Sequence, residues 1–158
     1  CELYPREVGL PFEIFIEPKL VNEDRMRMLR DAGLVSVYMG IQSSERVTGH
    51  LYDRRVKNQS IEDIAEMYNR LGVKPHFQLI YDDPVSTDED KKALFEMIAS
   101  FPHPYDLYLF SMTVFPGSEL NKKHKGWNLS YNQRDKKLRK KELKQREQEM
   151  HKSLFKKV

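Results

Sequence analysis

Apolar and polar residues alternate with a period of two in four short segments of the chain, and this spacing predicts β-strands. Between these segments, apolar residues recur at helical spacing. Four strands that alternate with helices are typical of a parallel sheet with right-handed crossovers. The predicted strands span 12–17, 34–41, 73–81 and 106–115, and the predicted helices span 22–32, 44–54, 60–72 and 87–99.

One face of each predicted strand is repeatedly polar, whereas a flat sheet with helices on both sides needs apolar residues on both faces. We therefore predict an α/β fold of the partial (βα) barrel type, in which the polar face lines a hydrophilic interior. The alternative is a sheet with one half-exposed face. The polar positions are Glu13, Glu17, Tyr38, Gln42, His76, Gln78, Ser111 and Thr113.

The chain has 158 residues and begins with Cys1, in what reads as a connection between a helix and a strand. We expect it to be a fragment of a longer protein, whose missing N-terminal part is one expected partner. The first predicted strand then has an unpaired edge, through which we expect the chain to self-associate unless terminal residues cover it.

Cysteine usage and hydropathy restrict the function classes. A single Cys excludes an internal disulfide framework and a cysteine-rich metal cluster built from this chain alone, and it fits a cytoplasmic protein. The sequence has no run of 18 apolar residues and no signal-peptide pattern, so we predict no contact with a membrane.

Charge is distributed unevenly. Residues 122–158 hold 14 Lys and Arg against four Asp and Glu, a net charge of +10, whereas the preceding residues carry −7. We predict two parts, a βα domain at 1–121 and a basic helical tail at 122–158. The tail is either a solvated charged segment or a contact for nucleic acid or an acidic partner.

The stretch from Val37 to Arg54 holds the first candidate chemistry, because a predicted strand ends there in polar residues. The ends of parallel strands are where such sheets handle ligands. The carboxamide of Gln42 can bind polar groups of either polarity, and Arg54 can form a fork on a carboxylate. The pair would suit a ligand with an amino acid moiety. The alternatives are that Ser43 and its neighbours only cap the next helix, and that Arg54 is a surface arginine.

The end of the third predicted strand carries a second set of candidates. The strand ends in Tyr81, Asp82 and Asp83, which precede Pro84. The two aspartate carboxylates could bind a metal or an amine or act as a base. The alternative is turn chemistry, since Asp is favoured before Pro. A histidine within a strand, such as His76, is more often a hydrogen-bonded lining residue than a catalyst.

The order of several short motifs resembles the second half of a radical SAM enzyme, most closely the Fe–S oxidoreductases that often carry an N-terminal cobalamin-binding domain. The resemblance covers residues 1–121. Its motifs are LPFE (10–13), LRDAG (29–33), VYMGIQS (37–43), YDR (52–54), NRLGVK (69–74), LIYDDP (79–84) and VFPGSEL (114–120).

This resemblance implies a partial (βα)6 barrel to which the chain supplies the third to sixth strands, with S-adenosylmethionine (SAM) lying across the strand ends. By residue match, Gln42 and Ser43 would face SAM and Arg54 would contact its carboxylate. The last strand, from Phe110 to Met112, would pass near the adenine. The substrate would face Glu17, Tyr38, His76, Gln78, Tyr81 and Asp82.

Two features depart from the family pattern. The CxxxCxxC segment that binds the [4Fe–4S] cluster is absent, and the turn after Gln42 has SSER where the family usually has SGSER. We therefore expect a parent enzyme that cleaves SAM reductively to start radical chemistry, and a fragment that is inactive alone. Any cobalamin would bind through another domain. The alternative is a non-catalytic βα domain whose basic tail binds nucleic acid or an acidic partner.

Overall fold

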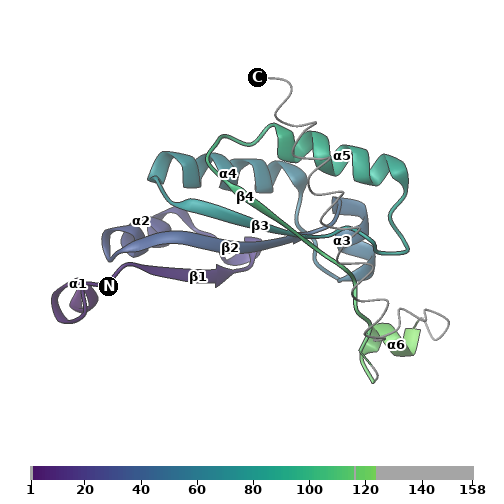
Figure 1. Ribbon diagram of the computed structural model, residues 1–158, viewed down its shortest axis with the longest axis horizontal. Helices are drawn as coiled ribbons and strands as arrows, with labels where there is room; N and C mark the ends of the chain where they lie inside the picture. Colours follow the sequence, from purple (N-terminus) through teal and green to yellow (C-terminus); the bar gives the residue numbers. More distant parts are fainter. Residues whose placement is uncertain (1, 116, 124–158) are drawn as a thin grey trace. The chain divides into compact units, whose positions relative to one another are not determined.

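The computed structural model describes residues 2–115 and 117–123, in which helices and strands alternate along the chain (Figure 1). The strands are β1 (Phe12–Ile16), β2 (Leu34–Gln42), β3 (Lys74–Ile80) and β4 (Asp106–Phe110). The helices are α1 (Leu3–Glu7), the 3-10 helix η1 (Pro18–Leu20), α2 (Glu23–Asp31), α3 (Glu45–Leu51), α4 (Asn58–Leu71), α5 (Asp88–Ala99) and α6 (Glu119–Lys123).

The strands form one sheet in the order β1-β2-β3-β4, and β2 pairs in parallel with both β1 and β3. Because sequential parallel strands lie side by side with helices between them, the predicted α/β fold class is confirmed as that of a partial (βα) barrel. None of the described helices is long and apolar enough to cross a membrane.

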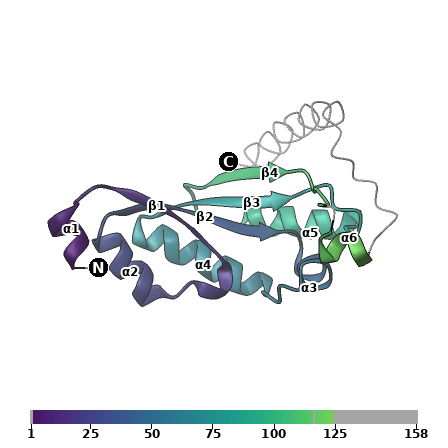
Figure 2. The same cartoon turned by 90° about the horizontal axis from the view of Figure 1, so that it is seen from below.

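Two compact units divide the chain. The first holds residues up to Leu79 together with Ser86–Tyr108, and the second holds Ile80–Val85 and the chain from Leu109. In the first unit, α2, α4 and α5 lie on one side of the strands, as Figure 2 shows. No described helix of that unit lies on the opposite side, which we call the open face of its sheet.

Local sequence signals set the helix ends as predicted. The side chain of Asn22 accepts a hydrogen bond from the backbone N–H of Arg25 and so caps α2. Thr87 and Asp90 form a capping box at the start of α5. Gly72 ends α4 at φ 67°, a left-handed conformation that glycine adopts without a steric penalty.

The core of the first unit lies between the strands and their helices. Met39 and Phe77 extend from the sheet and are fully buried, and Phe77 packs against Phe101 with ring centroids 4.9 Å apart. From the helices, Tyr68 is fully buried and its hydroxyl lies 3.9 Å from Met26 Sδ. Burial of large apolar side chains is the main stabilising contribution here, at about 1.5–3 kcal/mol each.

Several boundaries differ from those predicted. Residues 3–7, which lie outside every predicted helix and strand, form α1, and α4 begins at Asn58, two residues before the predicted start at Ser60. The short helix α1 ends at Val8, whose backbone N–H donates a hydrogen bond to Tyr4 O. At the start of α4, the backbone N–H of Asn58 is satisfied by Glu45 Oε2 at 3.0 Å, which replaces a local cap.

The strands differ from the predicted alternation of period two in one place and from the predicted bounds chiefly at the end of β4. In the β1–β2 pairing, Phe12 stands opposite Leu34 and Glu13 opposite Ser36, so Val35 has no partner residue in β1. With this register shift, Val35 is exposed (47%) and Leu34 is buried (3%). The last strand ends at Phe110, five residues earlier than predicted, so Ser111 and Thr113 lie beyond it. The tail predicted at 122–158 lies outside the described residues except for 122 and 123, which end α6.

Candidate functional site

The C-terminal end of β2 has an unusual backbone at the residue that the sequence singles out. Gln42 adopts φ 72°, a left-handed conformation that is uncommon outside glycine. The pairing with β3 skips one residue there, since Gly40 stands opposite Gln78 and Gln42 opposite Leu79. Such locally strained positions concentrate at functional sites, where the surrounding structure maintains them.

Gly40 gives the side chain of Gln42 the space it occupies. A Cβ atom placed on Gly40 would lie 2.1 Å from Gln42 Nε2 and 4.0 Å from Arg54 Nη1. Since no real Cβ approaches another heavy atom at 2.1 Å, only glycine permits this arrangement. The carboxamide and the guanidinium therefore both lie over the backbone of Gly40.

Arg54 is positioned by the loop that follows α3. Its backbone N–H donates to Thr48 O at 3.1 Å, after a left-handed residue at Asp53 (φ 52°). Its Nη2 lies 3.0 Å from Glu17 Oε1, which follows β1. The sequence candidates Gln42, Arg54 and Glu17 are thus gathered at one end of the sheet in the first unit.

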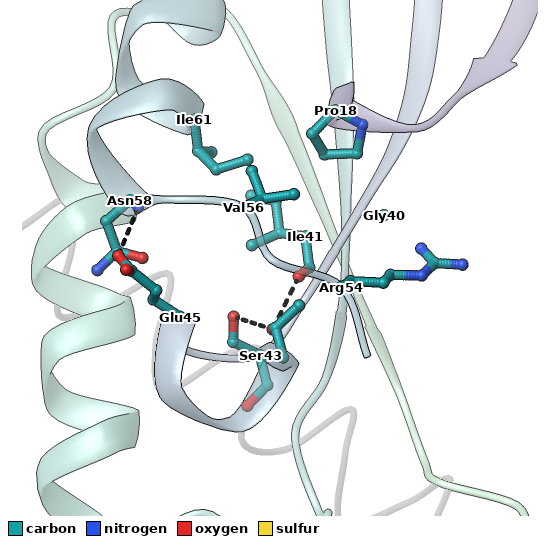
Figure 3. Close-up of a pocket in the computed structure, with 10 residues that line it drawn as sticks. Pro18, Gly40, Ile41, Ser43, Glu45, Arg54, Val56, Asn58 and Ile61 are labelled. Carbon is teal, nitrogen blue, oxygen red and sulfur yellow. Dashed lines mark hydrogen bonds between the residues drawn. The ribbon is translucent and has the colours of Figure 1, made fainter. Parts of the chain in front are cut away.

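The apolar side of the same region forms a small pocket with room for about one water molecule. In Figure 3 the guanidinium of Arg54 extends away from Val56 and Ile61, toward the side of Gly40. The charged group is therefore directed out of the apolar pocket and not into it. The pocket is lined by Pro18, Gly40, Ile41, Ser43, Glu45, Thr48, Arg54, Val56, Asn58 and Ile61.

The two serines after Gln42 are buried. Ser43 Oγ lies 3.1 Å from Ser86 Oγ, and the carbonyl of Ser43 accepts a hydrogen bond from Thr48 Oγ1 at 3.0 Å. Ser44 accepts a bond from the backbone N–H of Val47 and caps α3. The capping role predicted as the alternative is therefore the one that Ser44 has.

Asp90 joins the N-terminal ends of α3 and α5. Its carboxylate pairs with Arg46 and accepts hydrogen bonds from Ser44 Oγ and from the backbone and hydroxyl of Thr87. The guanidinium of Arg46 and these further donors hold the pKa of Asp90 well below its usual range. This network fixes the backbone that follows Gln42.

A row of aromatic rings crosses the open face of the sheet, one layer before the strand ends. Phe15 stacks on Tyr38 with centroids 4.7 Å apart, and Tyr38 stacks on His76 at 4.4 Å. Tyr108 lies at the far side of the row, 5.9 Å from His76 and tilted. Burial and the nearby carboxylate of Glu13 raise the pKa of Tyr38.

Beside the rings, Asp106 links two basic side chains. Its Oδ2 lies 2.8 Å from Lys74 Nζ and 3.0 Å from His76 Nδ1. The second contact has an ion-pair distance but not the alignment of a hydrogen bond. The hydrogen bond from Lys74 to Asp106 raises the pKa of the lysine. His76 is buried (7% exposed) and lines the sheet as expected, but its Nδ1 lacks the hydrogen bond that was also expected.

The remaining candidates belong to the second unit. Asp82 accepts hydrogen bonds at 2.5 Å from Ser111 Oγ and from the backbone N–H of Met112, so its carboxylate ties two chain segments together. The backbone N–H of Tyr81 donates to Phe110 O at 3.1 Å. Asp83 accepts from the backbone N–H of Val85, the turn chemistry that was predicted as the alternative.

Sequence reasoning missed three residues of this region. An isolated glycine inside a strand indicates a bulge or a close approach, and this signal could have identified Gly40. The Thr87-x-x-Asp90 spacing predicts the capping box, but nothing in it indicates the bonds of Asp90 to Ser44 and Arg46. Asp106 carries no motif, and only the strand pairing brings it to His76.

Comparisons with solved structures give three likenesses that cover most of the chain. The first is to the coproporphyrinogen III oxidase HemN from Escherichia coli, described as a radical SAM enzyme (TM-score 0.56, 20% identity, 65% of this chain and 24% of that chain). The second is to Elp3 from the archaeon Methanocaldococcus infernus (TM-score 0.61, 21% identity, 73% and 28%). The third is to TsrM from Kitasatospora setae, a radical S-adenosylmethionine methyltransferase with cobalamin and a [4Fe–4S] cluster bound (TM-score 0.57, 13% identity, 76% and 26%).

No protein-family model and no curated protein matches the sequence. The chain spans about a quarter of the length of each structural neighbour. At these identities the likeness concerns the fold and not the chemistry. The chain therefore has the partial (βα) barrel fold that is also found in radical SAM enzymes.

Proposed function

We propose that the chain is part of a radical SAM enzyme and that the end of β2 binds the amino acid moiety of SAM. The observation that carries this proposal is the arrangement of Gln42 and Arg54 over Gly40, at the C-terminal end of β2. The fold is also similar to that of solved radical SAM enzymes, which supports the proposal. Ligands of parallel α/β sheets bind at this end of the strands.

The side chains fit a zwitterionic amino acid group. Arg54 can donate two parallel hydrogen bonds to the carboxylate, and Glu17 can accept from the ammonium group. In the structure these two half-exposed residues pair with each other at 3.0 Å, in a contact that contributes little to stability. The carboxamide of Gln42 can bond to either polarity of group. Binding would therefore exchange the Arg54–Glu17 pair for two pairs with the amino acid group and leave neither charge of that group unpaired.

The iron–sulfur cluster does not fit this chain. The family motif needs three cysteines, and the sequence has one. Among residues 2–115 and 117–123, no three His, Cys, Asp or Glu side chains are grouped as metal ligands. The cluster, which supplies the electron that cleaves SAM, would thus be held by another part of the protein, as would any cobalamin. We expect the present chain to be inactive as a catalyst.

The open face next to this site would meet the substrate. We assign Tyr38, His76 and Gln78 to that role in the first unit, because the ring row lies one layer below the strand ends. Tyr81, Asp82, Phe110 and Met112 belong to the second unit, and their assignment to the substrate and to the adenine rests on the resemblance alone.

Equilibrium dialysis of the full chain against labelled SAM tests the proposal. Arg54→Gln should reduce the affinity about tenfold or more, because a hydrogen bond between charged groups contributes about 1.5–3 kcal/mol. The matched control is Arg55→Gln, which removes an exposed arginine one residue away and should bind as the unaltered chain does. Absence of binding, or equal loss in both variants, would contradict the proposal.

The charge of residues 122–158, +10, favours a second candidate function, in which a non-catalytic βα domain binds nucleic acid or an acidic partner through its tail. Salt-dependent binding of an RNA oligonucleotide together with no binding of SAM would favour this alternative.

A further inference from the structure

We propose that His76 accepts a proton from the substrate through its Nε2 atom, and that Asp106 is the positioning residue that keeps the proton of the neutral ring on Nδ1. The proposal deepens the proposed function, because it names the chemistry of one substrate-facing residue. The group bound there would carry a transferable proton, as a hydroxyl or an amine does. The proposal rests on the proposed function only for the presence of a substrate on the open face.

The imidazole of His76 is held from both sides. Tyr38 of β2 stacks on it, with centroids 4.4 Å apart and an angle of 13° between the ring planes. Tyr108 of β4 lies 5.9 Å away and is tilted. His76 belongs to β3, which has a strand on each side in the sheet, so the ring does not lie at a sheet edge. Its orientation is therefore set by the interior of the first unit.

The two nitrogens of the ring have different surroundings. Nδ1 is enclosed, lies 3.0 Å from Asp106 Oδ2 and has no aligned hydrogen bond. Nε2 forms no hydrogen bond within the described residues and, unlike Nδ1, is not enclosed. Nε2 is thus the nitrogen that a ligand on the open face can reach. A small rotation of the Asp106 carboxylate would align it with Nδ1 and satisfy the buried atom.

The carboxylate of Asp106 selects the tautomer of the neutral ring. An ionised carboxylate can only accept hydrogen bonds, so the nitrogen beside it must carry the proton. Nε2 then keeps its lone pair. A base that a third group orients in this way is typical of proton-transfer sites. In the step, the bond between the donor atom of the substrate and its hydrogen breaks, the proton joins Nε2, and the electron pair stays on the donor atom.

The charges near the ring can accommodate the imidazolium that this step forms. Asp106 pairs with Lys74 at 2.8 Å, so these two side chains carry no net charge together. Glu13 accepts a hydrogen bond from Ser36 and lies beside Tyr38 on the same face. The described groups around His76 and Tyr38 thus comprise two carboxylates, one ammonium group and the two phenols. A protonated His76 would balance the second carboxylate.

Nitrogen-15 magnetic resonance of the labelled full chain tests the tautomer without any ligand. At about pH 8.5, where imidazole is ordinarily neutral, His76 should carry its proton on Nδ1. Asp106→Asn should lose this single tautomer, because a carboxamide can donate as well as accept. The matched control is Lys74→Gln, which removes the other partner of Asp106 and should leave the tautomer unchanged. A proton on Nε2 in the unaltered chain, or the same tautomer in Asp106→Asn, would overturn the proposal.

Acylation by diethyl pyrocarbonate, which attacks unprotonated ring nitrogens, tests the access to Nε2. His76 should be modified in the unaltered chain, and at about half that rate in Asp106→Asn if its rings divide equally between the tautomers. His50, on α3, is the internal control, and its rate should be the same in both chains. No modification of His76, or equal rates in the two chains, would overturn the proposal.

The outcome can be separated from that of the proposed function. Asp106 is not among the residues assigned to SAM, so Asp106→Asn should bind SAM in dialysis as the unaltered chain does. If SAM does not bind at all, the proposed function fails while the tautomer is still measured. If SAM binds and His76 has its proton on Nε2, the inference about His76 alone is wrong.

Discussion

Phe77 and Phe15 are both strand phenylalanines of the first unit, yet Phe77 is fully buried against the helices and Phe15 is 77% exposed on the opposite face. The side of the sheet that faces the helices carries apolar residues, which pack against those helices. The open side carries carboxylates, stacked rings and a histidine, which packing within the described residues does not require. This difference is our reason for placing the proposed chemistry on the open face.

The largest loss of stability is expected when a buried strand phenylalanine is removed. Phe77→Ala should lower the free energy of unfolding by about 3–5 kcal/mol, because it removes a buried ring and leaves a cavity. Phe15→Ala, the matched change on the open face, should alter it by about 0.5 kcal/mol or less. Urea denaturation followed by circular dichroism measures both. Similar losses in the two variants would show that the open face is also a packed core.

A smaller effect is expected at the junction of α3 and α5. Asp90→Asn should cost about 2 kcal/mol, because hydrogen bonds to a charged group are worth about 1.5–3 kcal/mol. Asp88→Asn, an exposed aspartate in the same helical turn, is the control and should cost much less. The measurement is again urea denaturation, at neutral pH, and equal costs in the two variants would contradict the role of Asp90.

The same carboxylate predicts a pH dependence. Since the folded pKa of Asp90 is lowered, its contribution is present above the unfolded pKa of about 3.9 and is lost as the pH falls through the folded pKa. The stability difference between the unaltered chain and Asp90→Asn should therefore be constant near neutral pH and decrease below about pH 4. A difference that stays the same in acid would contradict this.

On the open face, Gly40→Ala should weaken the binding of SAM. The new Cβ would displace the carboxamide of Gln42, so we expect SAM affinity to fall about tenfold, or about 1.4 kcal/mol. Gly49→Ala is the matched control, because its Cβ would meet no atom within 4 Å and alanine favours the helix. SAM dialysis and thermal unfolding of both variants measure the effect. Unchanged SAM affinity in Gly40→Ala would remove Gln42 from the site.

The smallest effect is expected for Glu17→Gln. The Arg54–Glu17 pair is half-exposed, and exposed ion pairs contribute at most about 1 kcal/mol. We expect the free energy of unfolding to change by less than that in urea denaturation. A larger loss would mean that the pair holds the fold together and is not free to open for a ligand.

The sequence predicts the fold better than the site. Periodicity and caps locate the strands and the ends of α2 and α5, because these depend on neighbouring residues such as Asn22 and Thr87. The exposure of Val35 and the early end of β4 depend on strand pairing, which no local pattern encodes. The Arg54–Glu17 pair joins residues far apart in sequence. The predicted site residues remain predictions, although the structure brings three of them together.

The most direct test of the central claim is a nuclear magnetic resonance titration of the labelled full chain with SAM, and with adenosine as the control ligand. We expect SAM to shift the backbone signals of Gly40, Gln42 and Arg54 and the side-chain amide of Gln42. Adenosine, which lacks the amino acid group, should leave the Arg54 signal unchanged. Shifts confined to other regions, or none at millimolar SAM, would contradict the claim that this strand end binds the cofactor.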